Sequence, residues 1–211
     1  MDSLSVSASR RPRPSMSRIS TAVEGPLNFV LFGPPGAGKG TQADSFARRH
    51  NLPKLSTGDM LRTAIREGSR VGELVRDTLQ RGALVGDDVM IPLIGERLEQ
   101  RDTANGFVLD GFPRTIPQAA ALDALLVDRG RVIVVALVVH VDEVIRRLAG
   151  RGREDDEAYV IRERLAVYSR ETEPVLEYYR RRGTVTILDG NRPVDAVSDA
   201  IEAAVTARRR R

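Results

Sequence analysis

The chain has 211 residues, of which 41% are hydrophobic and 29% are charged, a composition ordinary for one folded domain with a sizeable core. It contains no cysteine, which excludes disulfides and cysteine-ligated zinc or iron. Its net charge of +4 comes from the ends, because residues 1–24 carry +2 and residues 208–211 carry +4. Residues 25–207 are therefore slightly acidic, and we expect no nucleic-acid partner.

Residues 1–24 are rich in serine and arginine and too poor in apolar side chains to offset the entropy cost of ordering, so we expect disorder there. Their composition also fits an organelle transit peptide, and a start at Met16 is an alternative. No apolar run reaches the roughly 18 residues of a membrane span. We therefore expect no membrane partner and a cytoplasmic location, with organelle targeting as the alternative.

From residue 27 onward, apolar runs that predict strands alternate with stretches that predict helices. In chain order we expect a strand at 27–32, a helix ending near Arg49, a short strand near Leu55, and helices at 60–67, 72–81 and 89–100. A strand at 107–110, a helix at 118–129, the longest strand at 132–141 and a helix at 143–149 follow. The series ends with a long helix at 159–181 bent near Pro174, a strand at 184–188 and a helix at 196–207. This alternation is typical of an α/β fold whose parallel sheet has helices on both faces and binds ligands beyond the carboxyl ends of its strands.

The segment GPPGAGKGT at 33–41 follows the first strand and opens a helix, which is the setting of a phosphate-binding loop. Its glycines let backbone N–H groups turn inward, and the helix start adds a positive dipole end. Lys39, one of only two lysines among 33 basic side chains, supplies a full charge for the phosphates. Gly40 stands where many such loops place the Ser or Thr that binds Mg²⁺, so we expect the metal to be held through water and acidic groups elsewhere.

Two further motifs follow strands. Thr57 and Asp59 lie between a strand end and a helix, so either can serve as a helix N-cap. Asp110 ends the strand at 107–110, where a carboxylate can organise hydrated Mg²⁺. Arg114 can then reach phosphate groups, and Gln118 offers both a hydrogen-bond donor and an acceptor.

A second group of arginines consists of Arg147, Arg151, Arg153 and Arg164. Arg147 and Arg151 are four residues apart at a helix end and share a face. Surface solvation is the plain alternative in so arginine-rich a chain. Both flanking helices are expected to end near the phosphate-binding loop and Asp110, however, so we expect these cations to close on phosphoryl groups.

Three motifs, GPPGAGKGTQ, LSTGDMLR and NGFVLDGFPRTIPQ, resemble in order and spacing the nucleoside monophosphate kinase family, and specifically adenylate kinase, from Leu27 to about Ala204. The resemblance implies a P-loop NTPase three-layer fold with a five-stranded parallel sheet, acting as a monomer on ATP, AMP and ADP with Mg²⁺. A kinase domain at 25–207 would comprise a core (25–55, 86–149 and 157–207), a mobile NMP-binding segment (56–85) and a short lid (150–156). A basic tail at 208–211 would follow, and so short a lid implies no zinc.

The resemblance also implies residue roles. Lys39, Asp110, Arg114, Arg151, Arg153 and Arg164 would be catalytic, with Asp110 holding Mg²⁺ through water. ATP would contact Gly36, Ala37, Gly38, Lys39, Gly40, Thr41, Arg147, Arg151, Gly190 and Arg192. AMP would contact Thr57, Arg62, Ala83, Leu84, Val85, Gly111, Phe112, Pro113, Arg114, Gln118, Arg153 and Arg164. Asp155 and Asp156 would help to lock the lid.

Three other functions are alternatives to ATP:AMP transfer. A UMP/CMP kinase shares the fold, the phosphate-binding loop and the short lid, but Thr57 together with Gln118 favours AMP. A GTP-dependent switch would need an Asn/Thr-Lys-x-Asp motif, and neither Lys39 nor Lys54 lies in one. A catalytically silent scaffold is the remaining alternative, although every charged position that the chemistry needs is present.

Overall fold

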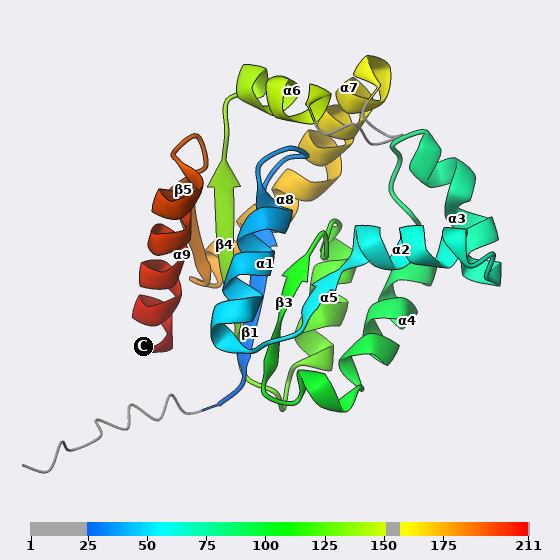
Figure 1. The fold of residues 1–211 in the computed structure, drawn as a ribbon. Helices are drawn as coiled ribbons and strands as arrows, with labels where there is room; N and C mark the ends of the chain where they lie inside the picture. The colour runs from blue at the N-terminus through cyan, green and yellow to red at the C-terminus, as the bar shows by residue number, and fades with distance from the viewer. Residues whose placement is uncertain (1–24, 151–156, 211) are drawn as a thin grey trace, which may run out of the picture.

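The computed structural model describes residues 25–150 and 157–210 (Figure 1). Within these ranges five strands form one sheet: β1 (Leu27–Phe32), β2 (Lys54–Ser56), β3 (Gly106–Asp110), β4 (Val132–Val138) and β5 (Val185–Asp189). All paired strands are parallel, in the order β2-β3-β1-β4-β5. The carboxyl ends of β1 and β3 are adjacent, because Leu31 pairs with Asp110.

Apolar residues alternate between the faces of the sheet, which therefore carries a hydrophobic core on each side. On β1, Val30 and Phe32 face one core, while Phe29 and Leu31 face the other. The first core is covered by α4 (Asp87–Leu98), α5 (Ile116–Leu125) and α8 (Glu173–Arg181), and the second by α1 (Lys39–His50) and α9 (Val194–Arg209). Because both faces are buried, the strands read as continuous apolar runs. The predicted three-layer α/β fold with five parallel strands is confirmed.

The other helices lie toward the carboxyl ends of the strands. α2 (Thr57–Arg66) and α3 (Arg70–Gln80) form a pair that projects to one side of the sheet in Figure 1. α6 (Val141–Ala149) and α7 (Ala158–Val167) lie beyond the end of β4 (Figure 1). A π-helical turn, η3 (Tyr168–Thr172), joins α7 to α8, and a 3₁₀ turn, η1 (Arg101–Thr103), precedes β3. Among the described residues, no helix is long and apolar enough to cross a membrane.

The strand predicted at 132–141 is shorter than expected. β4 stops at Val138, and α6 begins at Val141 after His140 as N-cap. The backbone N–H of His140 donates to Asn191 Oδ1 at 3.1 Å, which ties this connection to the loop after β5. The apolar run continues into the first turn of α6, so its length overestimates the strand.

Polar caps start several helices earlier than the apolar pattern suggests. Ser56 Oγ accepts a hydrogen bond from the backbone N–H of Asp59 at 3.3 Å, so Ser56 is the N-cap of α2. The sequence pattern instead predicts Thr57 or Asp59 as the cap. Ser69 and Thr115 cap α3 and α5 in the same way. The helices predicted at 60–67, 72–81 and 118–129 therefore begin two or three residues too late.

The C-terminal part also differs from the prediction. α9 continues to Arg209, and Arg208 donates hydrogen bonds to the backbone carbonyls of Gly183 and Val185. Residues 208 and 209, expected as the start of a basic tail, are thus part of the packed helix. The long helix expected at 159–181 is interrupted by η3 immediately before Pro174, whose missing N–H weakens the regular hydrogen-bond pattern there.

Candidate active site

The loop between β1 and α1 contains the predicted phosphate-binding residues and will be called the phosphate loop (residues 33–41). α1 begins at Lys39, with Gly38 as its N-cap. Gly36 has a φ of +80°, and a Cβ there would lie 3.0 Å from the carbonyl oxygen of Val144 in α6. A side chain therefore fits neither the backbone conformation nor the space at Gly36. The loop and α6 approach each other closely because this residue is glycine.

Lys39 curls back over the phosphate loop. Its Nζ donates to the carbonyl oxygens of Gly33 at 2.7 Å and Pro34 at 2.9 Å. These bonds hold the ammonium at the mouth of the loop, where the N-terminus of α1 adds a partial positive charge. The combination favours anionic groups.

Asp110 lies at the end of β3, next to the phosphate loop. Its Oδ2 is 3.7 Å from the point where a Cβ on Gly40 would lie, and Lys54 Nζ is 3.9 Å from the same point. Gly40 therefore leaves space beside a carboxylate and an ammonium. A lone carboxylate that faces a phosphate site fits Mg²⁺, which keeps most of its water ligands and takes its others from carboxylates and substrate phosphates. No cluster of three His, Asp or Glu side chains suitable for a metal is present in the described ranges.

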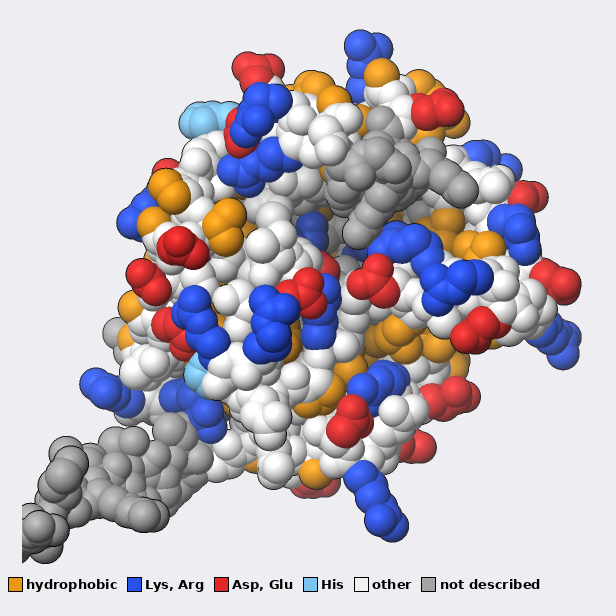
Figure 2. All heavy atoms as spheres, viewed as in Figure 1, with side chains coloured by type: hydrophobic (Ala, Val, Ile, Leu, Met, Phe, Trp, Pro, Cys, Tyr) orange, Lys and Arg blue, Asp and Glu red, His pale blue; other side chains and the backbone are white. Residues whose placement is uncertain are grey.

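A large cleft of about 1970 Å³, including the open space at its mouth, runs along the phosphate loop. Figure 2 shows this face hollowed near its centre, with basic side chains gathered there. The cleft brings together most of the predicted site: Gly36, Ala37, Gly38, Lys39, Gly40, Thr41, Arg62, Asp110, Gly111, Arg114, Arg147, Arg164, Gly190 and Arg192 all line it. Residues distant in the sequence thus form one cationic surface of a size that suits nucleotides.

Arg147 is anchored before any ligand binds. Its Nε donates to Glu143 Oε1 at 2.6 Å, and its Nη2 donates to the carbonyl oxygen of Gly190 at 3.0 Å. Arg146 makes two further hydrogen bonds to Glu143, both 2.7 Å long. The hydrogen bonds from Arg146 and then Arg147 lower the pKa of Glu143 from 4.5 to about 2. The carboxylate therefore stays ionised and holds Arg147 against the loop after β5.

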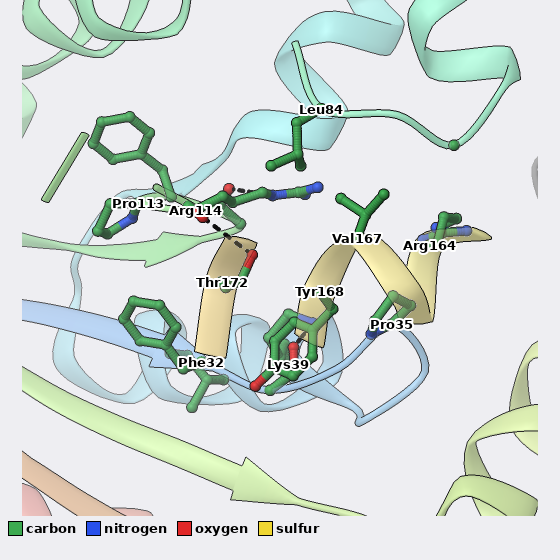
Figure 3. A pocket seen from close by; sticks show the side chains of 15 residues that line it. Phe32, Pro35, Lys39, Leu84, Pro113, Arg114, Arg164, Val167, Tyr168 and Thr172 are labelled. Carbon is green, nitrogen blue, oxygen red and sulfur yellow. Dashed lines mark hydrogen bonds between the residues drawn. The ribbon is translucent and has the colours of Figure 1, made fainter. Parts of the chain in front are cut away.

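A small cavity of about 560 Å³, including the open space at its mouth, lies between the phosphate loop and the helical segment formed by α7 and η3. Figure 3 shows Leu84 above the side chain of Arg114, with Arg164 and Tyr168 farther along the wall. The predicted residues that line it are Lys39, Leu84, Gly111, Phe112, Pro113, Arg114 and Arg164. Burial, and next the negative charge of Glu173, raises the pKa of Tyr168 to about 12, so this wall presents a neutral phenol.

Some residues predicted to read the AMP base lie behind the cavity wall. Thr57 is 1% exposed, and its hydroxyl donates to the carbonyl oxygen of Gly111 at 3.0 Å. Gln118 is 2% exposed, and its carboxamide is hydrogen bonded to Asp87 and to the backbone of Arg114. Neither side chain is among the described residues that line the two pockets.

The predicted adenine-lining run 83–85 is divided between the cavity and the core. Leu84 lines the small cavity, whereas Val85 packs in the first hydrophobic core. The backbone N–H of Ala83 donates to the carbonyl oxygen of Thr78 at 3.1 Å, which fixes the chain as it leaves α3. Leu84 is thus the member of this run that faces the cavity.

Arg62, predicted to meet a phosphate, is paired with Asp59 at 2.6 Å on the exposed side of α2. Burial raises the pKa of Asp59, but the hydrogen bonds from Arg62 and Ser56 and the positive charges of Arg62 and Lys54 together outweigh it, so the pKa lies below its ordinary value. Asp59 therefore remains a carboxylate at neutral pH. It holds Arg62 at the rim of the large cleft, which both residues line.

Four predicted residues, Arg151, Arg153, Asp155 and Asp156, lie outside the described residues. Conversely, the structure adds residues that the sequence interpretation did not assign. Lys54 lines the large cleft and forms an ion pair with Asp44 at 2.9 Å, and Glu143 anchors Arg147. The rarity of lysine in this chain marks Lys54 as unusual, but its place beside Gly40 depends on how β2 packs.

Most of the chain is similar in sequence to known proteins. A family model described as adenylate kinase matches residues 31–184. The chain is 47% identical over 186 residues to an adenylate kinase of Caulobacter sp. (strain K31), and 46% identical over 186 residues to that of Phenylobacterium zucineum (strain HLK1). It is 40% identical over 212 residues to an adenylate kinase of Methanocella arvoryzae (strain DSM 22066 / NBRC 105507 / MRE50). Each alignment covers 85% of this chain and 98% of the relative.

Proposed function

This chain belongs to the adenylate kinase family, and on that premise we infer that it is a phosphotransferase that converts ATP and AMP reversibly into two ADP. The observation that carries this conclusion is the convergence of Lys39, Arg114 and Arg164 on one cavity. That cavity is also lined by Leu84 from the NMP-binding segment (residues 56–85). Cations for a phosphoryl group and an apolar wall for a base therefore meet in one place.

The reaction is a direct in-line transfer between the two nucleotides. An oxygen of the AMP phosphate forms a bond to the γ-phosphorus of ATP while the bond from that phosphorus to the β–γ bridging oxygen breaks. The AMP phosphate is already nucleophilic at neutral pH, so no general base or covalent intermediate is needed. Catalysis then consists of positioning and of neutralising charge spread over the transferred group.

The residues divide this work by location. Lys39 and the N–H groups of the phosphate loop bind the ATP phosphates. Arg114 and Arg164 line both pockets, so they are placed to neutralise the group in transfer. The ATP end of the large cleft is lined by Arg147 and by the loop that carries Gly190 and Arg192. These residues add cations and backbone groups that can bind ATP.

Asp110 would hold magnesium through water, next to the phosphates of ATP. When bound, magnesium supplies positive charge that draws electron density from the transferred phosphoryl group. The position of Asp110 beside Gly40, where the chain leaves space next to the phosphate loop, supports this assignment.

The AMP side is formed by Thr57, Arg62, Leu84, the loop at 111–114 and Gln118. We assign the AMP phosphate to Arg62 and Arg114, and the base to Leu84 and Gln118. Thr57 supports the loop through its bond to Gly111. In the short lid, Arg151 and Arg153 are assigned to neutralising the group in transfer, and Asp155 and Asp156 to closure of the lid. Closure would exclude water and so prevent wasteful ATP hydrolysis.

The proposal is tested by an ADP-release assay with Mg-ATP and four acceptors in parallel: AMP, UMP, CMP and GMP. We expect rapid turnover with AMP and little with the other three. A preference for UMP or CMP would keep the phosphate chemistry and overturn the base assignment. Binding of ATP without transfer to any acceptor would overturn the enzymatic function. Light scattering on the same preparation would check the expected monomer of 23.2 kDa.

A further inference from the structure

Asp87, to which the sequence assigned no role, is hydrogen bonded to Gln118, the predicted reader of the AMP base. It is the first residue of α4, three positions after Leu84, which lines the small cavity. Its Oδ1 accepts a hydrogen bond from Gln118 Nε2 at 2.7 Å. Both of its oxygens lie 3.0 Å from the hydroxyl of Thr115, the N-cap of α5.

The other side of the Gln118 carboxamide is held by the backbone. The N–H of Arg114 donates to Gln118 Oε1 at 2.8 Å. A backbone N–H can only donate and a carboxylate can only accept, so the two partners together determine which end of the carboxamide is oxygen and which is nitrogen. The hydroxyl of Thr115 accepts from the N–H of Gln118 at 3.3 Å, which directs its own proton to Asp87.

Rotation of the carboxamide by half a turn would make two unfavourable contacts. The oxygen would face the Asp87 carboxylate, and the NH₂ group would face the N–H of Arg114. A buried polar group that loses its partner costs about 1–3 kcal/mol, and more beside a charge. Gln118 is therefore restricted to one orientation. These two bonds use one N–H and one acceptor lone pair, and leave one of each. Because Gln118 is 2% exposed, a base reaches these two atoms only when the side chains that cover them move aside.

We propose that Asp87 is a positioning residue that makes this site select a 6-aminopurine and reject a 6-oxopurine. The inference rests on the proposed role of Gln118 at the AMP base. Adenine presents an acceptor at N1 and a donor at N6, whereas hypoxanthine presents a donor at N1 and an acceptor at O6. Binding IMP as favourably as AMP would require the rotated carboxamide, and Asp87 opposes that rotation.

The test is the isosteric substitution Asp87→Asn, because an asparagine amide can either accept from Gln118 or donate to it. We would measure kcat/KM for AMP and for IMP at saturating Mg-ATP. The expected result is an increase on the order of tenfold in the ratio of kcat/KM for IMP to kcat/KM for AMP (the IMP:AMP ratio). The reason is that the contact between residue 87 and Gln118 then no longer favours one orientation of the carboxamide. The KM for ATP is expected to stay unchanged, which separates positioning from a general structural effect.

Asp88→Asn is the matched control. Asp88 is the next residue of α4, is exposed, and loses the same charge on substitution. The IMP:AMP ratio of the Asp88→Asn variant should stay within about twofold of that of the unmodified enzyme, as for most surface changes. If Asp87→Asn is shown by circular dichroism to be unfolded, Thr115→Val provides a second test, because it removes the hydroxyl that holds the Asp87 carboxylate and should raise the same ratio.

The outcomes separate this inference from the proposed function. If the unmodified enzyme prefers UMP or CMP to AMP, both fail. If it prefers AMP and Gln118→Leu removes its discrimination against IMP, but folded Asp87→Asn keeps the original ratio within about twofold, only the role of Asp87 is overturned. If Gln118→Leu itself leaves the IMP:AMP ratio unchanged, the base reader is a different residue and the inference is overturned with it.

Discussion

At the scale of single residues, Glu143 prepares Arg147 for the large cleft. An unpaired arginine samples many rotamers, and fixing one on ligand binding costs entropy. Glu143 lowers that cost by holding the guanidinium near Gly190 and Ala37, whose carbonyl oxygens lie 3.0 and 3.5 Å from Arg147 nitrogens. The same carboxylate restrains Arg146, an exposed residue of α6 that also lines the large cleft.

We expect Glu143→Gln to lower the stability of the protein in a pH-dependent way. The folded-state pKa of Glu143 lies at about 2, below its ordinary value of 4.5. A lowered carboxylate pKa contributes stability that is fully present above pH 4.5 and is lost as the pH falls toward 2. Urea unfolding of both proteins between pH 7 and pH 3 should therefore show a difference in unfolding free energy that narrows below about pH 4.5.

Glu177→Gln is the control for this prediction. Glu177 faces Arg180 and Arg181 on α8 with the same spacing, but it does not line the large cleft among the described residues. Glu143→Gln should raise the KM for ATP several-fold because Arg147 loses its anchor, whereas Glu177→Gln should leave that KM unchanged. An equal effect of both substitutions on KM would show that Glu143 has no specific role at the cleft.

At the scale of elements, the pair α2 and α3 depends on one close backbone approach. Gly72 in α3 packs against the end of α2, and a Cβ at this position would lie 2.1 Å from the carbonyl oxygen of Ala64. No real Cβ can approach that closely, so any side chain would separate the helices. The pair forms most of the NMP-binding segment, and Leu84 follows it into the small cavity.

We therefore expect Gly72→Ala to raise the KM for AMP about tenfold or more while the KM for ATP changes little. Displacing packed backbone costs about 1–3 kcal/mol, and 1.4 kcal/mol corresponds to a tenfold change in binding. Steady-state kinetics with each substrate varied in turn would measure both constants.

Gly95→Ala provides a matched control in another helix. Gly95 lies inside α4, and the nearest atom to an added Cβ would be 4.0 Å away. Alanine is favoured over glycine inside helices by about 1 kcal/mol, so this variant should be as stable as the original or more so, with unchanged KM values. An unchanged KM for AMP in Gly72→Ala would instead mean that α2 and α3 can move apart without disturbing the AMP side.

The observed starts of α2, α3 and α5 show that polar N-cap residues in the sequence indicate where a helix begins. Ser56, Ser69 and Thr115 each accept a backbone hydrogen bond at a helix start, and all three are visible in the sequence as polar residues before helical segments. Attention to these caps corrects the predicted starts of α2, α3 and α5. The end of β4 has no comparable signal, because Val139 and Val141 continue its apolar run past the point where pairing with β5 stops.

At the scale of the whole molecule, nucleotide binding joins parts that are separated along the chain. The large cleft is lined by the phosphate loop, α2, the ends of β2 and β3, α6, α7 and the loop after β5. A ligand that contacts all of these stabilises the folded state relative to the unfolded chain, because the unfolded chain has no such site.

We expect ADP at about 100 times its Kd to add about 2.7 kcal/mol of stability. For a protein of this length, that corresponds to a rise in Tm of roughly 5–11 °C. Differential scanning calorimetry would measure this rise in Tm, with GDP at the same concentration as a comparison that should give a smaller rise.

The variant Lys39→Met should lose most of the stabilisation by ADP and reduce turnover by about 10²-fold or more. Equal shifts for Lys39→Met and the unmodified enzyme, or near-normal turnover of the variant, would exclude Lys39 from the phosphate site.

The sequence by itself determined the parallel α/β fold and the position of the glycine-rich loop between β1 and α1. Both depend on local rules: apolar periodicity sets strands and helices, and Gly36, Gly38 and Lys39 lie at the spacing that a backbone turn around phosphates requires. Asp110 was recognisable for a related reason, since it ends a strand and parallel strands share one carboxyl edge.

Only the tertiary structure decided which distant residues meet. Asp87 and Gln118 are 31 positions apart, and Lys54 lies 14 positions from Gly40. Their contacts depend on the order of strands in the sheet and on how α4 and α5 pack, and no local pattern encodes either distance. Burial of Thr57 and Gln118 was also beyond a sequence interpretation, because a polar residue becomes buried only where the fold supplies hydrogen-bond partners in place of water.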